Sequence, residues 1–91
     1  MSEHARYVTF EGNVQGVGFR YTAQRLAGRH QISGWVRNLC DGRVELFAQG
    51  KPEYVRDYLD GIRANFSRHI HKTLQEERDC DQGLSGFRIR Y

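Results

Sequence analysis

Apolar and polar residues alternate near the start of the chain and then change to helical spacing. Residues 6–11 follow the two-residue period of a β-strand, with Val8 and Phe10 on one face. From residue 19 to about residue 30 the apolar side chains recur every three or four positions, which predicts an amphipathic helix. A glycine-rich corner separates these two segments. The chain is therefore expected to begin with a strand, a tight turn and a helix.

Two further strands are predicted after this helix, and they form a hairpin. The segments 32–38 and 43–49 combine β-branched and aromatic residues with spacing typical of strands. Asp41-Gly42 lies between them and is a dipeptide typical of hairpin turns. Gly50 is expected to end the second strand of this pair.

The last part of the chain predicts a second helix and two more strands. Pro52 suits the first turn of the helix. The buried stripe of this helix is expected to comprise Val55, Tyr58, Leu59, Ile62 and Phe66. Residues 70–77 predict a less regular strand, and residues 86–91 a short closing strand with Phe87, Ile89 and Tyr91 on one face. The order β-α-β-β-α-β plus a terminal strand indicates one α+β domain over residues 1–91. Its fold is ferredoxin-like, an antiparallel-rich sheet with both helices on one face.

Composition and charge are those of a small folded protein with a mild preference for anions. The chain has 91 residues, of which 38% are hydrophobic, and a formal net charge of +3, which favours anionic partners without identifying them. Its first residues lack the apolar core of a signal peptide and no stretch could span a bilayer, so we expect a cytoplasmic protein with no membrane partner. Cys40 and Cys80 are then most simply free thiols, with a disulfide between them as the alternative.

The corner that ends at Arg20 is the strongest candidate for a binding site. Gly16 and Gly18 allow the backbone to turn its N–H groups into one concavity, at the positive end of a helix. Arg20 adds a cation where a helix disfavours one unless an anion is held there. The corner has neither the Gly-Lys-Ser/Thr of a P-loop nor the third glycine of a dinucleotide fingerprint. We expect a phosphate or similar oxyanion here; a plain turn is the alternative.

Topology is expected to bring a second polar residue to this corner. Strands joined by a helical crossover run parallel, so the strands at 6–11 and 32–38 end at the same edge of the sheet. The first ends at the glycine corner and the second at Asn38. Asn38 and Arg20 should therefore lie close together. Without that topology, Asn38 would be an ordinary strand-end residue that bonds local backbone.

Two motifs resemble those of the acylphosphatases. They are Gly12-x-Val14-Gln15-Gly16-Val17-Gly18-Phe19-Arg20 and Gly34-Trp35-Val36-Arg37-Asn38-x-x-Asp41-Gly42-x-Val44-Glu45. Chain length, element order and Gly50 agree as well, so the resemblance spans nearly the whole chain. One departure is Asn65-Phe66-Ser67-Arg68, where many members of the family carry a Gly-Pro pair. This segment lies away from the expected site and affects the start of the fourth strand more than the chemistry.

The resemblance implies hydrolysis of acyl phosphates to a carboxylate and inorganic phosphate, with no metal, cofactor or phosphoenzyme. It implies that Arg20 and the N–H groups of the 15–20 loop bind the phosphate and that Asn38 orients the attacking water. Arg20 and Asn38 are thus the catalytic candidates. The substrate-binding candidates are Gln15, Gly16, Val17, Gly18, Phe19 and Arg20. The expected partners are the small acyl phosphate and, as product or inhibitor, inorganic phosphate or another oxyanion, and we expect a monomer.

Two functions of other classes fit the same order of elements. An RNA-binding RRM would need an aromatic-rich motif on the third strand, whereas residues 43–48 are acidic and aliphatic, so no nucleic-acid partner is expected. A non-catalytic ligand-binding or interaction domain would not require both Arg20 and Asn38. His69-x-His71 has the spacing of some metal sites but no third ligand in view, so a solvated strand edge is the simpler interpretation. Phe19 and Trp35 are expected in the core or in a pocket wall.

Overall fold

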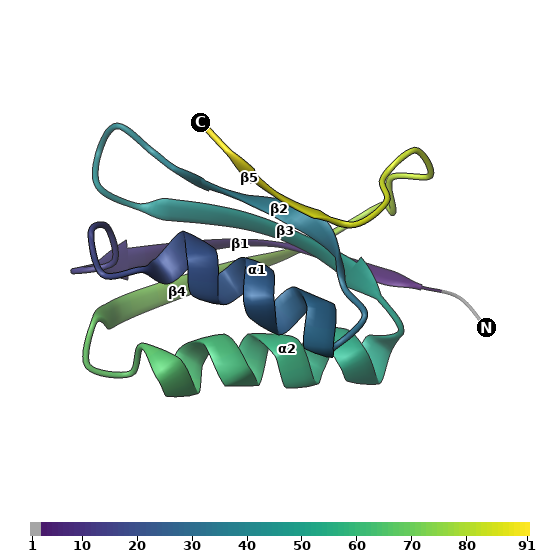
Figure 1. Ribbon diagram of the computed structural model, residues 1–91, viewed down its shortest axis with the longest axis horizontal. Helices are drawn as coiled ribbons and strands as arrows, with labels where there is room; N and C mark the ends of the chain where they lie inside the picture. Colours follow the sequence, from purple (N-terminus) through teal and green to yellow (C-terminus); the bar gives the residue numbers. More distant parts are fainter. Residues whose placement is uncertain (1–2) are drawn as a thin grey trace.

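A five-stranded sheet carries two helices on one of its faces (Figure 1). The computed structural model describes residues 3–91. The elements are β1 (His4–Gly12), α1 (Phe19–Arg29), β2 (Ser33–Asn38), β3 (Val44–Gly50), α2 (Pro52–Asn65), β4 (Ile70–Arg78) and β5 (Phe87–Arg90). Both helices lie on the same side of the sheet, with α1 beside α2 (Figure 1). The ferredoxin-like α+β fold expected from the order of elements is confirmed.

The strand order β4-β1-β3-β2-β5 places β3 at the centre. β3 is antiparallel to both β1 and β2, so β1 and β2 run in the same direction. In the register of the sheet, Phe10 and Asn38 both lie opposite Val44. The last residue of β2 is therefore level with Phe10 on the other side of β3, and β1 continues two residues further at the same edge of the sheet. β5 pairs with β2 in parallel and makes the sheet mixed.

The core lies between the sheet and the helices and follows the predicted pattern. The inward residues of the strands include Val8, Phe10, Val36, Val44 and Leu46, all fully buried. The helices cover them with Phe19, Ala23, Leu26 and Ala27 from α1 and with Val55, Tyr58, Leu59 and Ile62 from α2. Phe66, just after α2, is buried as its predicted stripe requires. A buried apolar side chain of this size contributes about 1.5–3 kcal/mol to folding.

Tyr58 joins the two helices through a polar contact inside this core. Its hydroxyl donates a hydrogen bond of 2.8 Å to the backbone carbonyl oxygen of Ala23. Burial raises the pKa of Tyr58, so the hydroxyl stays protonated and keeps this bond. The middle of α1 is thereby held by the same core that holds α2.

The two strands at the edges of the sheet, β4 and β5, differ in detail from the strands that the sequence predicts. β4 begins at Ile70 as predicted, and most of its residues are exposed because it is an edge strand with one neighbour, which explains its irregular pattern. Phe87 and Ile89 pack against the core, but Tyr91 does not share their burial and is 89% exposed. β5 is Phe87–Arg90, so it is shorter than the predicted strand at 86–91 and Tyr91 lies just beyond its end.

No helix in residues 3–91 is long and apolar enough to cross a membrane. Cys40 and Cys80 are both free thiols, so the disulfide alternative is not realised. Cys40 is exposed in the β2–β3 turn, two residues after Asn38.

Candidate active site

The loop between β1 and α1 uses glycine where the backbone is left-handed. Gly16 has φ 77° and Gly18 has φ 80°. An L-residue with a Cβ pays about 1–2 kcal/mol in this conformation, whereas glycine does not. Gly18 is also the N-cap of α1, so this helix begins without a capping side chain. The first turn of α1 is thus left open to an external partner.

Most backbone N–H groups along this loop have no partner among residues 3–91. Asn13 N–H donates to the carbonyl oxygen of His69, and Thr22 N–H donates to that of Gly18. Between them, none of the N–H groups from residue 14 to residue 21 donates a hydrogen bond to any residue of 3–91. Free N–H groups at a helix start, with the positive end of the helix dipole, form a site for an anion.

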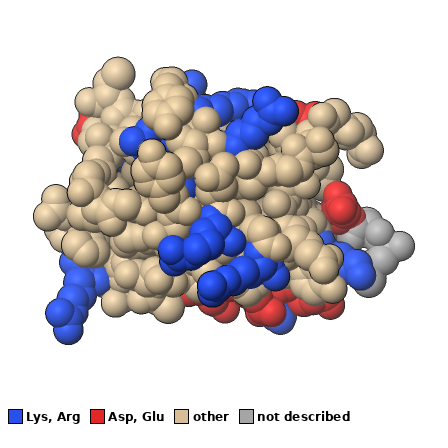
Figure 2. Space-filling model, in the orientation of Figure 1, with Lys and Arg blue, Asp and Glu red and all other residues tan. Residues whose placement is uncertain are grey.

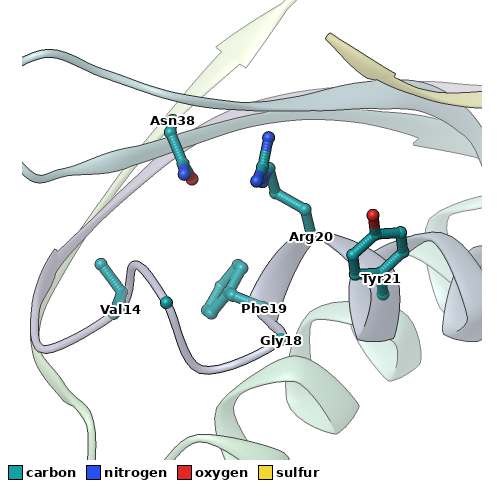
Figure 3. A pocket seen from close by; sticks show the side chains of 7 residues that line it. Val14, Gly18, Phe19, Arg20, Tyr21 and Asn38 are labelled. Atoms are coloured by element: carbon teal, nitrogen blue, oxygen red, sulfur yellow. The ribbon is translucent and has the colours of Figure 1, made fainter. Parts of the chain in front are cut away.

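A pocket of about 250 Å³ opens at this point, between the start of α1 and the end of β2 (Figure 3). The residues that line it are Val14, Gly16, Gly18, Phe19, Arg20, Tyr21 and Asn38. Arg20 reaches in from α1 and Asn38 from β2, and Figure 3 shows both side chains directed into the space above the loop. The structure therefore brings together the two residues that topology predicted to meet.

Arg20 has no carboxylate partner within the described residues. The ion pairs found within residues 3–91 involve other arginines, and none of them includes Arg20. The guanidinium carbon of Arg20 instead lies 5.1 Å from the centre of the Tyr91 ring, a contact that leaves its N–H groups free. Its charge is consequently available to an anion in the pocket.

The surrounding surface is also positive. Helix α1 carries Arg20, Arg25 and Arg29 and no acidic residue. Figure 2 shows Lys and Arg side chains over the upper part and middle of the helix-covered face, with most of the Asp and Glu along its lower edge, where α2 lies. An anion that approaches this face is therefore attracted toward α1 rather than α2.

Asn38 has an unusual side chain, because its Oδ1 atom is buried and has no hydrogen-bond partner among the described residues. Leaving a buried acceptor unpaired costs about 1–3 kcal/mol, so such atoms are rare in folded proteins. The register of β2 with β3 fixes the backbone of Asn38 opposite Val44. The unpaired oxygen is thus an acceptor held ready in the wall of the pocket.

Phe19 forms the apolar wall of the pocket and anchors the start of α1. It is 2% exposed, and its ring stacks on Phe66 with centroids 4.6 Å apart. It also packs against Phe10 at 5.1 Å. These contacts fix the backbone at the residue directly before Arg20.

Two of the expected substrate-binding residues do not line the pocket. The side chain of Val17 packs against the hydrophobic core, and the amide of Gln15 donates hydrogen bonds to the carbonyl oxygens of Leu39 and Arg43. Conversely, Val14 and Tyr21 line the pocket but were not among the candidates from sequence. Tyr21 is 65% exposed and directly follows Arg20, a position that helical spacing alone does not mark as functional.

Trp35 was expected in the core or in a pocket wall, and this prediction is wrong. It lies on the helix-free face of the sheet, level with Phe47 on β3, and the two rings are stacked with centroids 6.2 Å apart. Arg37 occupies the same face and forms an ion pair with the buried Glu45. Strand alternation explains this, because Val36 and Asn38 point to the other face.

His69 and His71, which have the sequence spacing of some metal sites, have no third candidate ligand near them in residues 3–91. Across residues 3–91, no three His, Cys, Asp or Glu side chains are grouped closely enough to hold a metal ion. The ring of His69 instead packs edge-on against Phe66, with centroids 6.2 Å apart.

Comparison with known proteins assigns the family. The acylphosphatase family profile matches residues 6–89. The chain is 44% identical to an acylphosphatase of Geobacillus thermodenitrificans over 87 residues, 93% of this chain and 92% of that protein. It is 41% identical to one from Bacillus velezensis over 83 residues, 89% of this chain and 91% of that protein. The crystal structure of the acylphosphatase from Bacillus subtilis superposes with a TM-score of 0.84 at 29% identity, covering 99% of this chain and 100% of that one. This chain therefore belongs to the acylphosphatase family of hydrolases.

Proposed function

We propose that this chain hydrolyses acyl phosphates by holding the phosphoryl group at the start of α1 and directing a water molecule at it from Asn38. The observation that carries the proposal is the meeting of three unpaired groups in one pocket. These are the free N–H groups of the β1–α1 loop, the guanidinium of Arg20 and the buried Oδ1 of Asn38. Two are donors suited to an anion, and the third is an acceptor suited to water.

The donors suit a phosphoryl group in particular. A planar guanidinium binds two phosphate oxygens at once, and the loop N–H groups from Gln15 to Arg20 take up the remaining charge. Catalysis of phosphoryl transfer rests mainly on positioning and on stabilisation of this charge, because the protein performs little covalent chemistry. A pocket built largely from backbone N–H groups and one arginine is sufficient for that task.

The leaving group explains why the pocket needs no general acid. Acyl phosphates release a carboxylate, whose conjugate acid has a pKa of about 4 by analogy with Asp and Glu, so it departs without a proton. Asn38 Oδ1 accepts a hydrogen bond from the attacking water and turns a lone pair of that water toward phosphorus. Asparagine is not a base, and the residues that line the pocket include no histidine or carboxylate. The phosphoryl oxygens are therefore the acceptors closest to the proton that water loses.

The proposed partners follow from this chemistry. The substrate is a small acyl phosphate, and inorganic phosphate or another oxyanion competes for the same donors as product or inhibitor. The reaction as proposed uses no metal, no cofactor and no covalent intermediate. We further propose a cytoplasmic monomer that acts without a nucleic-acid partner.

Hydrolysis of benzoyl phosphate in the presence of EDTA tests the proposal. We expect turnover well above the spontaneous rate, unchanged by the chelator, with competitive inhibition by inorganic phosphate. An aryl phosphate monoester serves as the matched control, because its leaving group is a stronger base and departs poorly without an acid. Absence of turnover with benzoyl phosphate, or loss of turnover with EDTA, would contradict the proposal.

A further inference from the structure

Gln15 belongs to the phosphate loop, yet its side chain leaves that loop and ends on the β2–β3 turn. Its Nε2 donates to the carbonyl oxygen of Leu39 at 2.8 Å and to that of Arg43 at 3.0 Å. A side-chain amide nitrogen carries two hydrogens, so these bonds use both of them. Two simultaneous bonds from one nitrogen fix the direction of the amide as well as its distance.

The two carbonyl groups are themselves part of a closed turn. Leu39 N–H donates to Arg43 at 2.8 Å, and Gly42 N–H donates to Leu39 at 3.2 Å. Each of these oxygens therefore already accepts one hydrogen bond and uses its second lone pair for Gln15. The Gln15 amide is bound to a rigid frame rather than to a mobile loop.

The chain neighbours of these groups line the pocket. Gly16 follows Gln15 and lines the pocket floor, while Leu39 directly follows Asn38. Gln15 thus connects the phosphate loop to the strand end that carries Asn38, across 24 residues of sequence. The other hydrogen bonds that hold the loop lie at its ends, from Asn13 N–H to His69 and at the start of α1, and between them Val14 and Val17 pack against the core.

We propose that Gln15 is a positioning residue that fixes the phosphate loop relative to Asn38. This inference rests on the proposed function, because it concerns the distance between the bound phosphorus and the water that Asn38 directs. Without the side-chain tie, the loop still offers its N–H groups and Arg20 to an anion, but only the packing of Val14 and Val17 then resists a shift of the loop against β2. A misplacement of about 1 Å between reacting groups lowers a rate by about 100-fold.

Gln49 provides a matched control. It is a buried glutamine that, like Gln15, ties two segments of the chain together, since its Nε2 donates to the carbonyl oxygen of Asp81 at 3.0 Å and its Oε1 accepts from Asp81 N–H at 2.8 Å. It lies at the opposite end of β3 from Val44, the residue level with Asn38. Gln49→Met therefore also removes two hydrogen bonds between a side-chain amide and the backbone, one donated and one accepted, without touching the pocket.

The first test compares Gln15→Met with Gln49→Met in steady-state hydrolysis of benzoyl phosphate. Methionine keeps the length of the side chain but cannot donate. We expect Gln15→Met to lower kcat by about 10- to 100-fold while the inhibition constant of inorganic phosphate changes by less than about threefold. Gln49→Met should lower thermal stability to a similar extent and leave kcat unchanged. Equal kcat values for the two variants, or a phosphate affinity that falls as much as kcat, would overturn the proposal.

A double-mutant cycle separates positioning from general loosening of the fold. If Gln15 acts through Asn38, Gln15→Met should have almost no further effect on kcat in the Asn38→Ala background, because the water that it helps to align is already unaligned. A full, additive loss of kcat in the double variant would overturn the proposal.

NMR tests the same tie without a reaction. Inorganic phosphate should shift the side-chain amide signal of Asn38 in the unmodified protein and in Gln49→Met. In Gln15→Met, phosphate should still shift the loop N–H signals but should lose its effect on Asn38. An unchanged Asn38 response in Gln15→Met would contradict the inference. Absence of turnover in the unmodified protein would instead contradict the proposed function, and the NMR response would still decide the role of Gln15.

Discussion

The two strand-to-helix connections of this molecule differ in how they treat the N–H groups of the first helical turn, which have no partner within the helix. The connection from β3 to α2 is short, with Lys51 as the N-cap and Pro52 at the first helical position. Proline has no N–H to leave unpaired, and Lys51 accepts hydrogen bonds from the N–H groups of Tyr54 and Val55. Glu53 places a negative charge in the first turn, where the helix dipole favours one. Two of the three N–H groups of residues 53–55 are therefore satisfied from within the protein.

The connection from β1 to α1 shares only one of these devices, the hydrogen bond from Thr22 N–H to the carbonyl oxygen of its N-cap, Gly18. Neither N-cap has a capping side chain, but the first turn of α1 contains no acid and carries the cation Arg20. From residue 14 to residue 21, its N–H groups find no acceptor among residues 3–91. The start of α2 is mostly satisfied internally and carries an acid, whereas the start of α1 combines unpaired N–H groups with a cation. This difference indicates that the start of α1 is shaped for an external anion.

Removing the charge at the start of α1 should have the largest effect. We expect Arg20→Ala to lower kcat/KM for benzoyl phosphate by about 1,000-fold or more, because the guanidinium neutralises charge on the transferring group. Arg56→Ala on α2 is the matched control, since Arg56 is exposed and pairs with Asp57 at 3.3 Å. If both variants retained full activity, the contrast between the two helices would have no functional meaning.

Removing the acceptor opposite α1 should affect turnover more than binding. We expect Asn38→Ala to lower kcat by about 100-fold with little change in the inhibition constant of phosphate, because water placement is lost but the anion site is intact. Asn65→Ala is the control, as the Asn65 amide only bonds Gly61 on the exposed side of α2. A large loss of phosphate affinity in Asn38→Ala would assign Asn38 to anion binding instead.

The glycine at the start of α1 should matter through its backbone angle. We expect Gly18→Ala to cost about 1–2 kcal/mol of stability because φ is 80°, and to weaken phosphate binding if the loop relaxes. A Cβ at Gly18 would meet no atom within 4 Å, so the cost is conformational. Gly28→Ala within the same helix also meets no atom, and should stabilise the protein by about 0.5–1 kcal/mol. Denaturant unfolding checks both signs, and a stabilised Gly18→Ala would contradict the expected strain.

The acid at the start of α2 should have the smallest effect. We expect Glu53→Gln to lose about 0.3–1 kcal/mol of stability and no activity, because this charge only complements the helix dipole. Thermal unfolding at low salt and the benzoyl phosphate assay measure the two effects. A change in turnover would show that α2 contributes to the reaction in a way that its position does not explain.

The sequence alone predicted the order of elements, the core stripe of α2 and the meeting of Arg20 with Asn38. These features follow from periodicity and from the direction of strands, which are properties of the chain itself. It did not predict that Gln15 faces the β2–β3 turn, because that contact depends on how a six-residue loop lies against a hairpin. It also misplaced Trp35, since an apolar residue in a strand can cover either face and only the register decides which.

The most direct test of the contrast is an NMR titration of the protein with inorganic phosphate, followed at the backbone N–H signals of both helix starts. We expect large, saturable shifts at residues 15–20, no comparable shifts at residues 51–55, and a dissociation constant equal to the competitive inhibition constant. Absence of shifts at residues 15–20, or equal shifts at both helix starts, would contradict the claim that the start of α1 is the phosphate site.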